Sequence, residues 1–327
     1  MKYVVTGATG FLGTHVVRAL EARGHDVVRF SRSTGGDVLN SEQVRNAAIG
    51  CEGVFHCAGK VSRKPEDAEP LYRVHVEGTR VVLAACAAAR VRRVVVASTS
   101  GTVAVSQHAT HVATEDAPPP LGIIGRWPYY RAKLFAEQSA LAANNAKLEV
   151  ICVNPSLLLG PGDERGSSTG DVQSFLEGGV AAVPAGGLSF VDVRDAAEAM
   201  RLAMDHGRPG ERYLVGACNL TMREFLGRLA RIARVKGPVF SLPRSREFVR
   251  VGAEFTSRLA SRIGVRSPID PVTAEMAQFF WYLDASKARS QLGFRARDPN
   301  ITLHDTIADL RARGVVWPAD ESASSSS

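Results

Sequence analysis

The chain has 327 residues, with 40 Lys and Arg against 33 Asp and Glu, and therefore a formal net charge of +7. Its composition, 45% hydrophobic and 22% charged, is ordinary for a soluble globular protein and excludes a wholly disordered or collagen-like chain. No apolar run approaches the ~20 residues that cross a bilayer, so we expect no membrane span. The basic residues are scattered, and the cluster Arg90, Arg92 and Arg93 fits a solvated helix end better than a nucleic-acid surface.

The five cysteines are odd in number and form no CxxC pair, so they predict neither a disulfide framework nor a zinc site. The first residues enter a strand-like run directly, without the basic and apolar segments of a signal peptide. We therefore expect a cytoplasmic protein with no metal site.

Short β-branched runs alternate with longer Ala-rich segments from Lys2 to about residue 155. The expected strands are Tyr3–Thr6, Val27–Phe30, Gly53–Cys57, Val94–Ser98 and Glu149–Val153. The expected helices between them are Thr14–Arg23, Ser41–Ala48, Leu71–Ala89 and Tyr129–Asn144. The first four strands are largely apolar along their length, as strands buried on both faces of a parallel sheet are. The alternation predicts an α/β fold, a doubly wound parallel sheet of the Rossmann type.

A glycine-rich turn, Thr6–Gly13, follows the first strand and opens a helix. Gly7, Gly10 and Gly13 permit a tight turn, close approach of the backbone to a diphosphate and close contact between helix and strand. The backbone N–H groups at the start of the helix then face the anion. Because strand, turn and helix occur together, the pattern predicts a dinucleotide site.

The end of the second strand distinguishes the two nicotinamide cofactors. A carboxylate there binds the ribose 2′-hydroxyl, whereas Arg accommodates a 2′-phosphate. This chain has Ser31 and Arg32 and no carboxylate before Asp37. The sequence therefore favours NADP(H).

A hydroxyl-rich run, Ser98–Val103, follows the fourth strand, and Tyr129 and Lys133 lie further along the chain. A spacing of four residues places this Tyr and Lys on one face of a helix. A nearby ammonium lowers the pKa of a phenol, and a serine hydroxyl can hold the substrate oxygen. The combination predicts acid–base chemistry on a carbonyl or an alcohol.

The composition changes after Pro155, where Gly, Pro and Ser become more frequent. We expect residues 1–155 to form the NADP-binding domain, to which some later segments return. Residues 156–317 then form mainly a smaller substrate-binding lobe, and 318–327 a disordered tail.

Motifs over nearly the whole chain resemble the extended short-chain dehydrogenase/reductase superfamily, which includes the NAD-dependent epimerases and dehydratases. The branch that it resembles most is the dihydroflavonol reductase and 3β-hydroxysteroid dehydrogenase-like one. The matching segments are TGATGFLG at 6–13, Asp37-Val38, HCAG at 56–59, STSGTV at 98–103, YYRAK at 129–133, NPS at 154–156, GPGD at 160–163, FVDVRD at 190–195, YLD at 282–284 and LGF at 292–294.

The resemblance implies that Tyr129 is the general acid/base and that Lys133 lowers its pKa and binds the nicotinamide ribose. Ser100 then orients the substrate oxygen, with Thr99 as the alternative hydroxyl. His75 stands where the superfamily often has Asn. The implied cofactor-binding residues are Gly7, Thr9, Gly10, Phe11, Leu12, Gly13, Ser31, Arg32, Asp37, Val38, Ala58, Gly59, Lys133, Pro155 and Ser156.

The resemblance implies an NADP(H)-dependent ketoreductase, and two other functions remain open. A sugar-nucleotide epimerase with bound NAD needs a cationic clamp, for which Arg165, Arg194 and Arg212 are candidates. A non-catalytic NADP-sensing regulator has no need of the complete Ser, Tyr and Lys set. We expect a small-molecule carbonyl or alcohol as partner. Relatives in the superfamily are often homodimers, so a homodimer is one of the assemblies that the resemblance allows.

The apolar residues of the later lobe fit a core stripe better than a ligand site, although they favour a hydrophobic substrate over a charged one. They are Phe248, Phe255, Met276, Phe279, Phe280 and Trp281. His108 and His111 lie between the Ser and Tyr motifs and are interpreted as loop residues.

Overall fold

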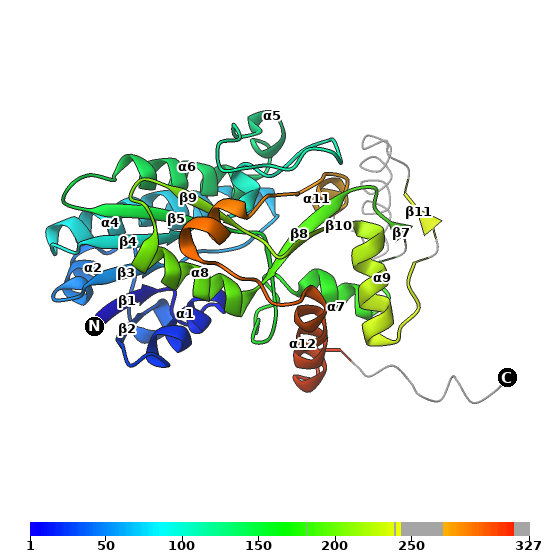
Figure 1. Cartoon of the computed structure of the whole chain (residues 1–327), viewed down its shortest axis with the longest axis horizontal. Helices are drawn as coiled ribbons and strands as arrows, with labels where there is room; N and C mark the ends of the chain where they lie inside the picture. Colours follow the sequence, from blue (N-terminus) through cyan, green and yellow to red (C-terminus); the bar gives the residue numbers. More distant parts are fainter. Residues whose placement is uncertain (181, 239, 243–270, 317–327) are drawn as a thin grey trace.

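A six-stranded parallel sheet dominates the computed structural model, which describes residues 1–180, 182–238, 240–242 and 271–316 (Figure 1). The strand order is β2-β1-β3-β4-β5-β9. The strands are β1 (Lys2–Thr6), β2 (Asp26–Phe30), β3 (Gly53–His56), β4 (Arg93–Ala97), β5 (Glu149–Pro155) and β9 (Arg212–Val215). The winding direction reverses between β1 and β3, and ligands of such sheets bind at the carboxyl ends of the strands there. The predicted doubly wound sheet is confirmed.

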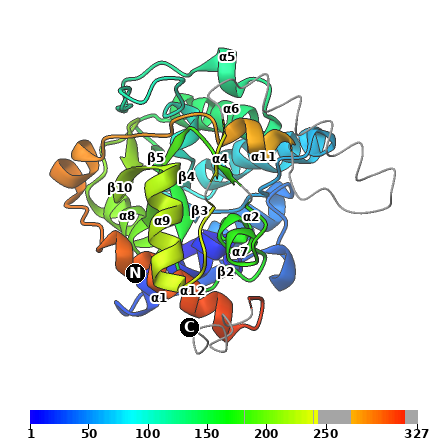
Figure 2. The ribbon, with the colours of Figure 1, turned by 90° about the vertical axis from the view of Figure 1, so that its right-hand side faces the viewer.

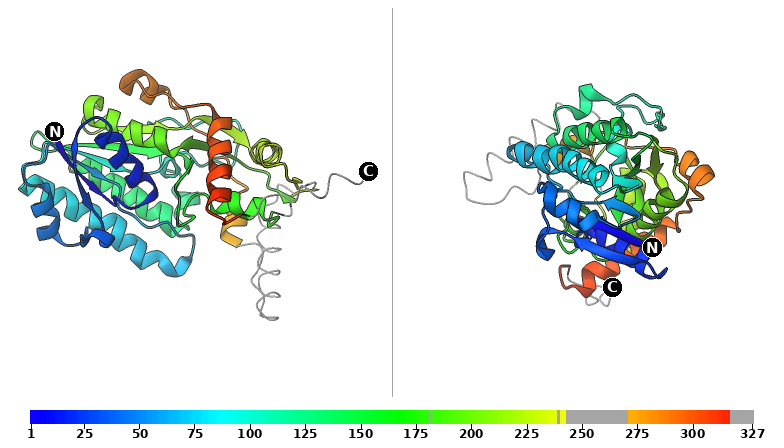
Figure 3. Two further views of the ribbon diagram at one scale, coloured as in Figure 1. Left: turned by 90° about the horizontal axis from the view of Figure 1, so that it is seen from below. Right: turned by 90° about the vertical axis from the view of Figure 1, so that its left-hand side faces the viewer.

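Helices cover both faces of this sheet, as the right-hand view of Figure 3 shows. One face packs against α1 (Phe11–Glu21) and α8 (Val193–His206). The other packs against α2 (Ser41–Ala48), α4 (Gly78–Ala88) and α6 (Pro128–Ala142). Val4 and Val5, neighbours on β1, enter opposite core clusters because side chains alternate along a strand.

Two expected elements differ from the structure. β2 is only half-buried, because it is the edge strand, and its Arg29 reaches outward to pair with Glu21 at 2.7 Å. The helix expected at Leu71–Ala89 consists of α3 (Ala68–Tyr72), a π-helical turn at Arg73–Glu77 and α4. Further short helical turns are Arg32–Thr34, Pro65–Asp67, Ser100–Thr102, α5 (Leu121–Ile124) and Ala288–Leu292.

A smaller lobe lies beside the carboxyl edge of the sheet, at the right of Figure 1 and toward the viewer in Figure 2. Its three-stranded sheet has the order β10-β8-β6 and its two-stranded sheet pairs β11 with β7. The elements are β6 (Leu157–Leu159), α7 (Gly170–Leu176), β7 (Ala182–Val183), β8 (Gly187–Asp192), β10 (Cys218–Thr221), α9 (Met222–Ala233), β11 (Phe240–Ser241), α11 (Pro271–Met276) and α12 (Pro299–Ala312).

The chain passes between the two parts more than once. After β8 it forms α8 and then β9, which pairs with β5 in the large sheet, so this sheet draws strands from both sides of residue 155. Phe248, Phe255 and the predicted tail at 318–327 lie outside the described residues. Within the described ranges, no helix combines the length and the apolar character needed to cross a bilayer.

Candidate active site

The glycine-rich turn joins β1 to α1 and leaves no room for side chains at two positions. Gly7 has a left-handed backbone with φ +65°, and a Cβ there would lie 2.7 Å from Cα of Ala58. A Cβ on Gly13 would lie 2.1 Å from the carbonyl oxygen of Gly7. Helix α1 begins at Phe11 after the N-cap Gly10, which has no side chain to cap it, and its first turn has no acidic residue, so its first N–H groups are available to an anion. The turn therefore fits a diphosphate.

Hydroxyl groups from two loops meet at the end of β2. The Ser33 hydroxyl lies 3.0 Å from the Ser31 hydroxyl and 3.0 Å from that of Thr9, which belongs to the glycine-rich turn. Arg32 is exposed beside them, whereas the Asp37 carboxylate accepts a hydrogen bond from the Leu39 N–H. This arrangement fits an added phosphate on the ribose. Sequence reasoning missed Ser33, although the run Ser31–Thr34 is visibly rich in hydroxyls.

The residues predicted after β3 lie next to the glycine-rich turn. The Ala58 N–H donates to the Thr6 hydroxyl at 3.3 Å, and Gly59 lies against the His75 ring. Val38 is buried against Gly78 at the start of α4. The structure therefore brings the carboxyl ends of β1, β2 and β3 together at one edge of the sheet.

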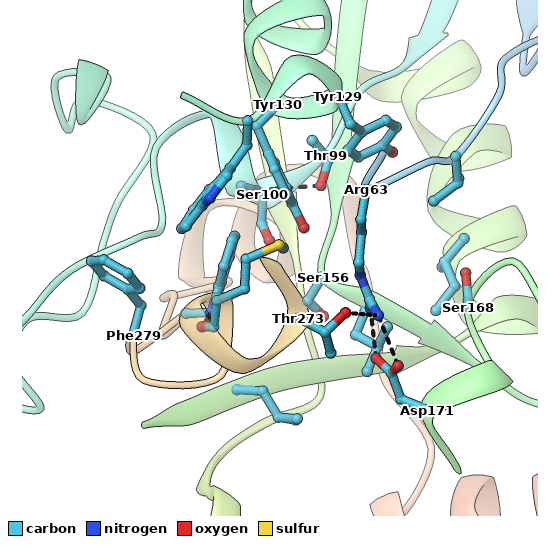
Figure 4. Close-up of a pocket in the computed structure, with 18 of the residues that line it drawn as sticks. Arg63, Thr99, Ser100, Tyr129, Tyr130, Ser156, Ser168, Asp171, Thr273 and Phe279 are labelled. Carbon is cyan, nitrogen blue, oxygen red and sulfur yellow. Dashed lines mark hydrogen bonds and ion pairs between the residues drawn. The ribbon is translucent and has the colours of Figure 1, made fainter. Parts of the chain in front are cut away.

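A cavity of about 240 Å³ lies between this edge and the smaller lobe (Figure 4). Ser100 and Tyr129 both line it, the first from the turn after β4 and the second from the first turn of α6. Other lining residues are Thr99, Tyr130, Pro155 and Ser156 on the sheet side, and Leu188, Met222, Met276, Phe279 and Trp281 on the lobe side. Three of the predicted aromatic and Met residues thus line the cavity, and Phe279 also belongs to a core cluster.

The ionisable pair on α6 differs from the expectation. Burial raises the pKa of Tyr129 above its usual value, and the neighbouring Tyr130 adds to this. The Lys133 ammonium donates to the Ala97 carbonyl oxygen at 2.8 Å, and burial lowers the pKa of Lys133 to about 8. The pKa of Tyr129 is therefore raised in this structure, and burial is the main cause. The phenol therefore carries its proton at neutral pH.

The two hydroxyls after β4 have different surroundings. The Thr99 hydroxyl accepts a hydrogen bond from the Gly101 N–H at 3.3 Å and caps the short helical turn. Ser100 is 4% exposed and lines the cavity. The Ser156 hydroxyl is buried and has no hydrogen-bond partner among the described residues. A buried hydroxyl in this state is available to bind a ligand.

The arginines considered for a diphosphate clamp have other partners or positions. Arg194 pairs with Asp192 at 2.7 Å and with Asp305 at 2.6 Å, and Arg212 pairs with Glu137 at 2.7 Å. Arg165 is exposed, as are His108 and His111. In the part of the chain that the structure describes, no group of His, Cys, Asp and Glu has the arrangement of a metal site.

An ion pair between Arg63 and Asp171 lies at the cavity, and no sequence pattern predicted it. The Arg63 guanidinium contacts both oxygens of Asp171, at 2.8 and 2.6 Å, and donates to Thr273 at 3.0 Å. Figure 4 shows Arg63 reaching from the loop after β3 toward Asp171 on α7. The pair therefore joins the cofactor side of the cavity to the smaller lobe.

The sequence profile of the NAD dependent epimerase/dehydratase family matches residues 3–216, which is more than half of the chain. The chain belongs to this family of extended short-chain dehydrogenases and reductases, as its motifs predicted.

Two curated proteins are similar over nearly the whole length. A putative dihydroflavonol 4-reductase from Synechocystis sp. is 31% identical, with 94% of this chain and 92% of the relative covered. A 4-hydroxy-2-methyl-3-oxo-4-farnesyl-3,4-dihydroquinoline-1-oxide ketoreductase from Stigmatella aurantiaca is 28% identical, with 99% and 98% covered. Among solved structures, gox2253 superposes with a TM-score of 0.80 at 29% identity, covering 96% of this chain and 99% of the other.

Proposed function

We propose that the protein is an NADP(H)-dependent oxidoreductase that reduces the ketone of an apolar small molecule, or oxidises the matching secondary alcohol. The observation that carries the proposal is the shared cavity, in which Ser100 and Tyr129 face apolar side chains of the smaller lobe. Family membership and the reductase names of the relatives support an oxidoreductase.

The cofactor side of the site has a residue set that fits NADP(H). Gly7, Gly10 and Gly13 permit the close backbone packing of the turn that is proposed to bind the diphosphate, and Ser31 and Arg32 are the proposed partners of the 2′-phosphate. The residues proposed to contact the remainder of the cofactor are Thr9, Phe11, Leu12, Asp37, Val38, Ala58, Gly59, Lys133, Pro155 and Ser156. When bound, NADPH supplies a hydride from C4 of its nicotinamide.

The protein's own groups handle the substrate oxygen. The Ser100 hydroxyl donates a hydrogen bond to the carbonyl, and the protonated Tyr129 phenol gives its proton to the oxygen as the alcohol forms. Lys133 stabilises the resulting phenolate by its positive charge. The apolar lobe side chains exclude water and bind the rest of the ketone.

The test is a scan of ketones of increasing size with wild type and Tyr129→Phe. The decrease in NADPH absorbance measures turnover. We expect turnover of apolar ketones and a loss of about 10²- to 10⁴-fold in kcat on removal of the phenol. Tyr72→Phe, at an exposed position on α3, is the control and keeps wild-type activity. Full activity of Tyr129→Phe would disprove the catalytic assignment. Purification with stoichiometric NAD, together with isomerisation of a UDP-sugar, would establish an epimerase instead.

A further inference from the structure

A buried carboxylate, that of Glu137, lies beneath the proposed catalytic residues and has no role in the chemistry described so far. Its side chain is 2% exposed and lies on α6, four residues after Lys133 and eight after Tyr129. Residues at this spacing lie on one side of a helix. One helix side therefore carries the phenol, the ammonium and this carboxylate.

Four groups converge on Glu137, two from the strands β5 and β9 and two from the segment that follows β4. The Ser98 hydroxyl donates to one carboxylate oxygen, the Thr102 hydroxyl lies 3.2 Å from it, and the Asn154 amide donates to it at 2.5 Å. Arg212 of β9 pairs with the other oxygen at 2.7 Å. Because an ionised carboxylate only accepts hydrogen bonds, it fixes the direction of each of these donors.

The turn that bears Ser100 is held at both of its ends by this network. Ser98 precedes the turn and its hydroxyl donates to Glu137, whereas the hydroxyl of Thr102, which closes the turn, lies 3.2 Å from Glu137 and 3.0 Å from the Thr99 carbonyl oxygen. The Asn154 amide also donates to the Thr99 carbonyl oxygen at 3.1 Å. The position of Ser100 relative to α6 therefore depends on one side chain of that helix.

We propose that Glu137 is a positioning residue, whose carboxylate holds the Ser100 turn against the side of α6 that carries Tyr129 and Lys133. This inference rests on the proposed function. A buried charge is costly unless it is paired and hydrogen-bonded, and Arg212 with three donors meets that condition. A displacement of about 1 Å at a reacting centre costs on the order of 10²-fold in rate, so the network acts on kcat.

Glu137 also faces Lys133, and its negative charge raises the pKa of that ammonium against the effect of burial. The other groups that interact electrostatically with Lys133 are His56 at the end of β3, Cys57 directly after it, His75 on the π-helical turn, and Cys152 on β5. None of these is removed when Glu137 alone is replaced.

The test compares Glu137→Gln with Glu149→Gln. Glu149 pairs with Arg93 at 2.6 Å where β5 and β4 begin, whereas the Glu137 network lies where these two strands end. Glu149→Gln therefore controls for the loss of an ion pair in the sheet. We expect Glu137→Gln to lower kcat roughly 10- to 100-fold, with KM for NADPH within about twofold of wild type. The alkaline limb of its pH–kcat profile moves to lower pH. Glu149→Gln keeps the wild-type kcat and profile. Equal loss of kcat in the two variants, or wild-type kcat in folded Glu137→Gln, overturns the proposal.

Two further measurements cover other outcomes. If Glu137→Gln does not fold, Thr102→Val removes one donor and keeps the charge; a kcat within about twofold of wild type then overturns the proposal, and a tenfold loss supports it. If wild type reduces no ketone, the proposed function fails, and NMR titration of the Lys133 Cε resonance becomes the test. A lower Lys133 pKa in Glu137→Gln, absent in Glu149→Gln, supports the electrostatic interaction between Glu137 and Lys133, and an unchanged pKa contradicts it.

Discussion

The proposed selection of NADP(H) depends on individual side chains at the end of β2. Replacing Arg32 by Ala removes the proposed charged partner of the 2′-phosphate, a hydrogen bond worth ~1.5–3 kcal/mol. We expect KM for NADPH to rise about 10- to 100-fold while KM for NADH stays unchanged, as measured by steady-state kinetics. Arg29→Ala is the control, since Arg29 is engaged with Glu21 on the outer side of the edge strand. An equal rise for both cofactors would contradict the assignment.

The choice between the two hydroxyls after β4 is also decided by single residues. The Thr99 hydroxyl accepts a hydrogen bond from the Gly101 N–H, whereas Ser100 lines the cavity and does not accept this hydrogen bond. We expect Ser100→Ala to lower kcat about 10²- to 10³-fold, the usual effect of losing a donor to the substrate oxygen. Thr99→Val is expected to lower it less than about tenfold. Assays at saturating NADPH measure both, and the reverse order would make Thr99 the orienting residue.

Local spacing predicted some residues of the site and not others. Ser100 and Tyr129 were predicted from short motifs, and they line one cavity in the structure. The Arg63–Asp171 pair joins residues 108 positions apart, and nothing in either local sequence indicates the contact. The sequence did not indicate the direction of Lys133 toward the Ala97 carbonyl either, since this direction depends on how α6 packs against the sheet.

The turn between β1 and α1 is the element that is proposed to bind the diphosphate of the cofactor. Ala at position 13 would place a methyl group 2.1 Å from the Gly7 oxygen, which forces α1 away from β1. We expect Gly13→Ala to lose NADPH binding and about 1–3 kcal/mol of unfolding free energy, measured by fluorescence titration and urea denaturation. Gly122→Ala on α5 is the control, because a Cβ there meets nothing within 4 Å. Intact binding by Gly13→Ala would rule out this packing argument.

The elements were predicted well where the hydrophobic pattern is local. Ser41–Ala48 is a helix with the expected ends, and the five expected strands form within two residues of their predicted limits. The sequence did not indicate that β2 is an edge strand, because its apolar residues resemble those of a central strand although they pack on one face only. The π-helical turn at Arg73–Glu77 interrupts a pattern that reads as one continuous helix.

The stability of the whole molecule is expected to fall in mild acid. His56 is buried, and desolvation lowers its pKa from 6.5 to about 3; burial also lowers the pKa of His75. Each stays neutral in the folded chain while the unfolded chain takes up a proton below about pH 6.5. The stabilisation by His56 is therefore complete above that pH and is lost toward about pH 3, at ~1.4 kcal/mol per pH unit, and the lowered pKa of His75 acts in the same direction.

Urea denaturation at several pH values between about 7 and 5 measures this dependence. We expect a shallower slope of unfolding free energy against pH for His56→Gln than for wild type, whatever the absolute stability of the variant. His108→Gln, at an exposed loop position, keeps the wild-type slope. Identical slopes in wild type and His56→Gln would show that this imidazole does not contribute.

The repeated passage of the chain between its two parts restricts how substrate preference can change in evolution or by design. The cavity wall is assembled from separate stretches, which include residues 61–63, 98–101, 127–130, 155–158, 167–171, 187–189 and 272–281. Between some of them the chain completes the large sheet with β9. Exchange of one contiguous block for that of another enzyme would therefore remove a strand of the cofactor sheet along with the pocket wall. New specificities in this protein are accessible by scattered point substitutions, and not by transplanting a domain.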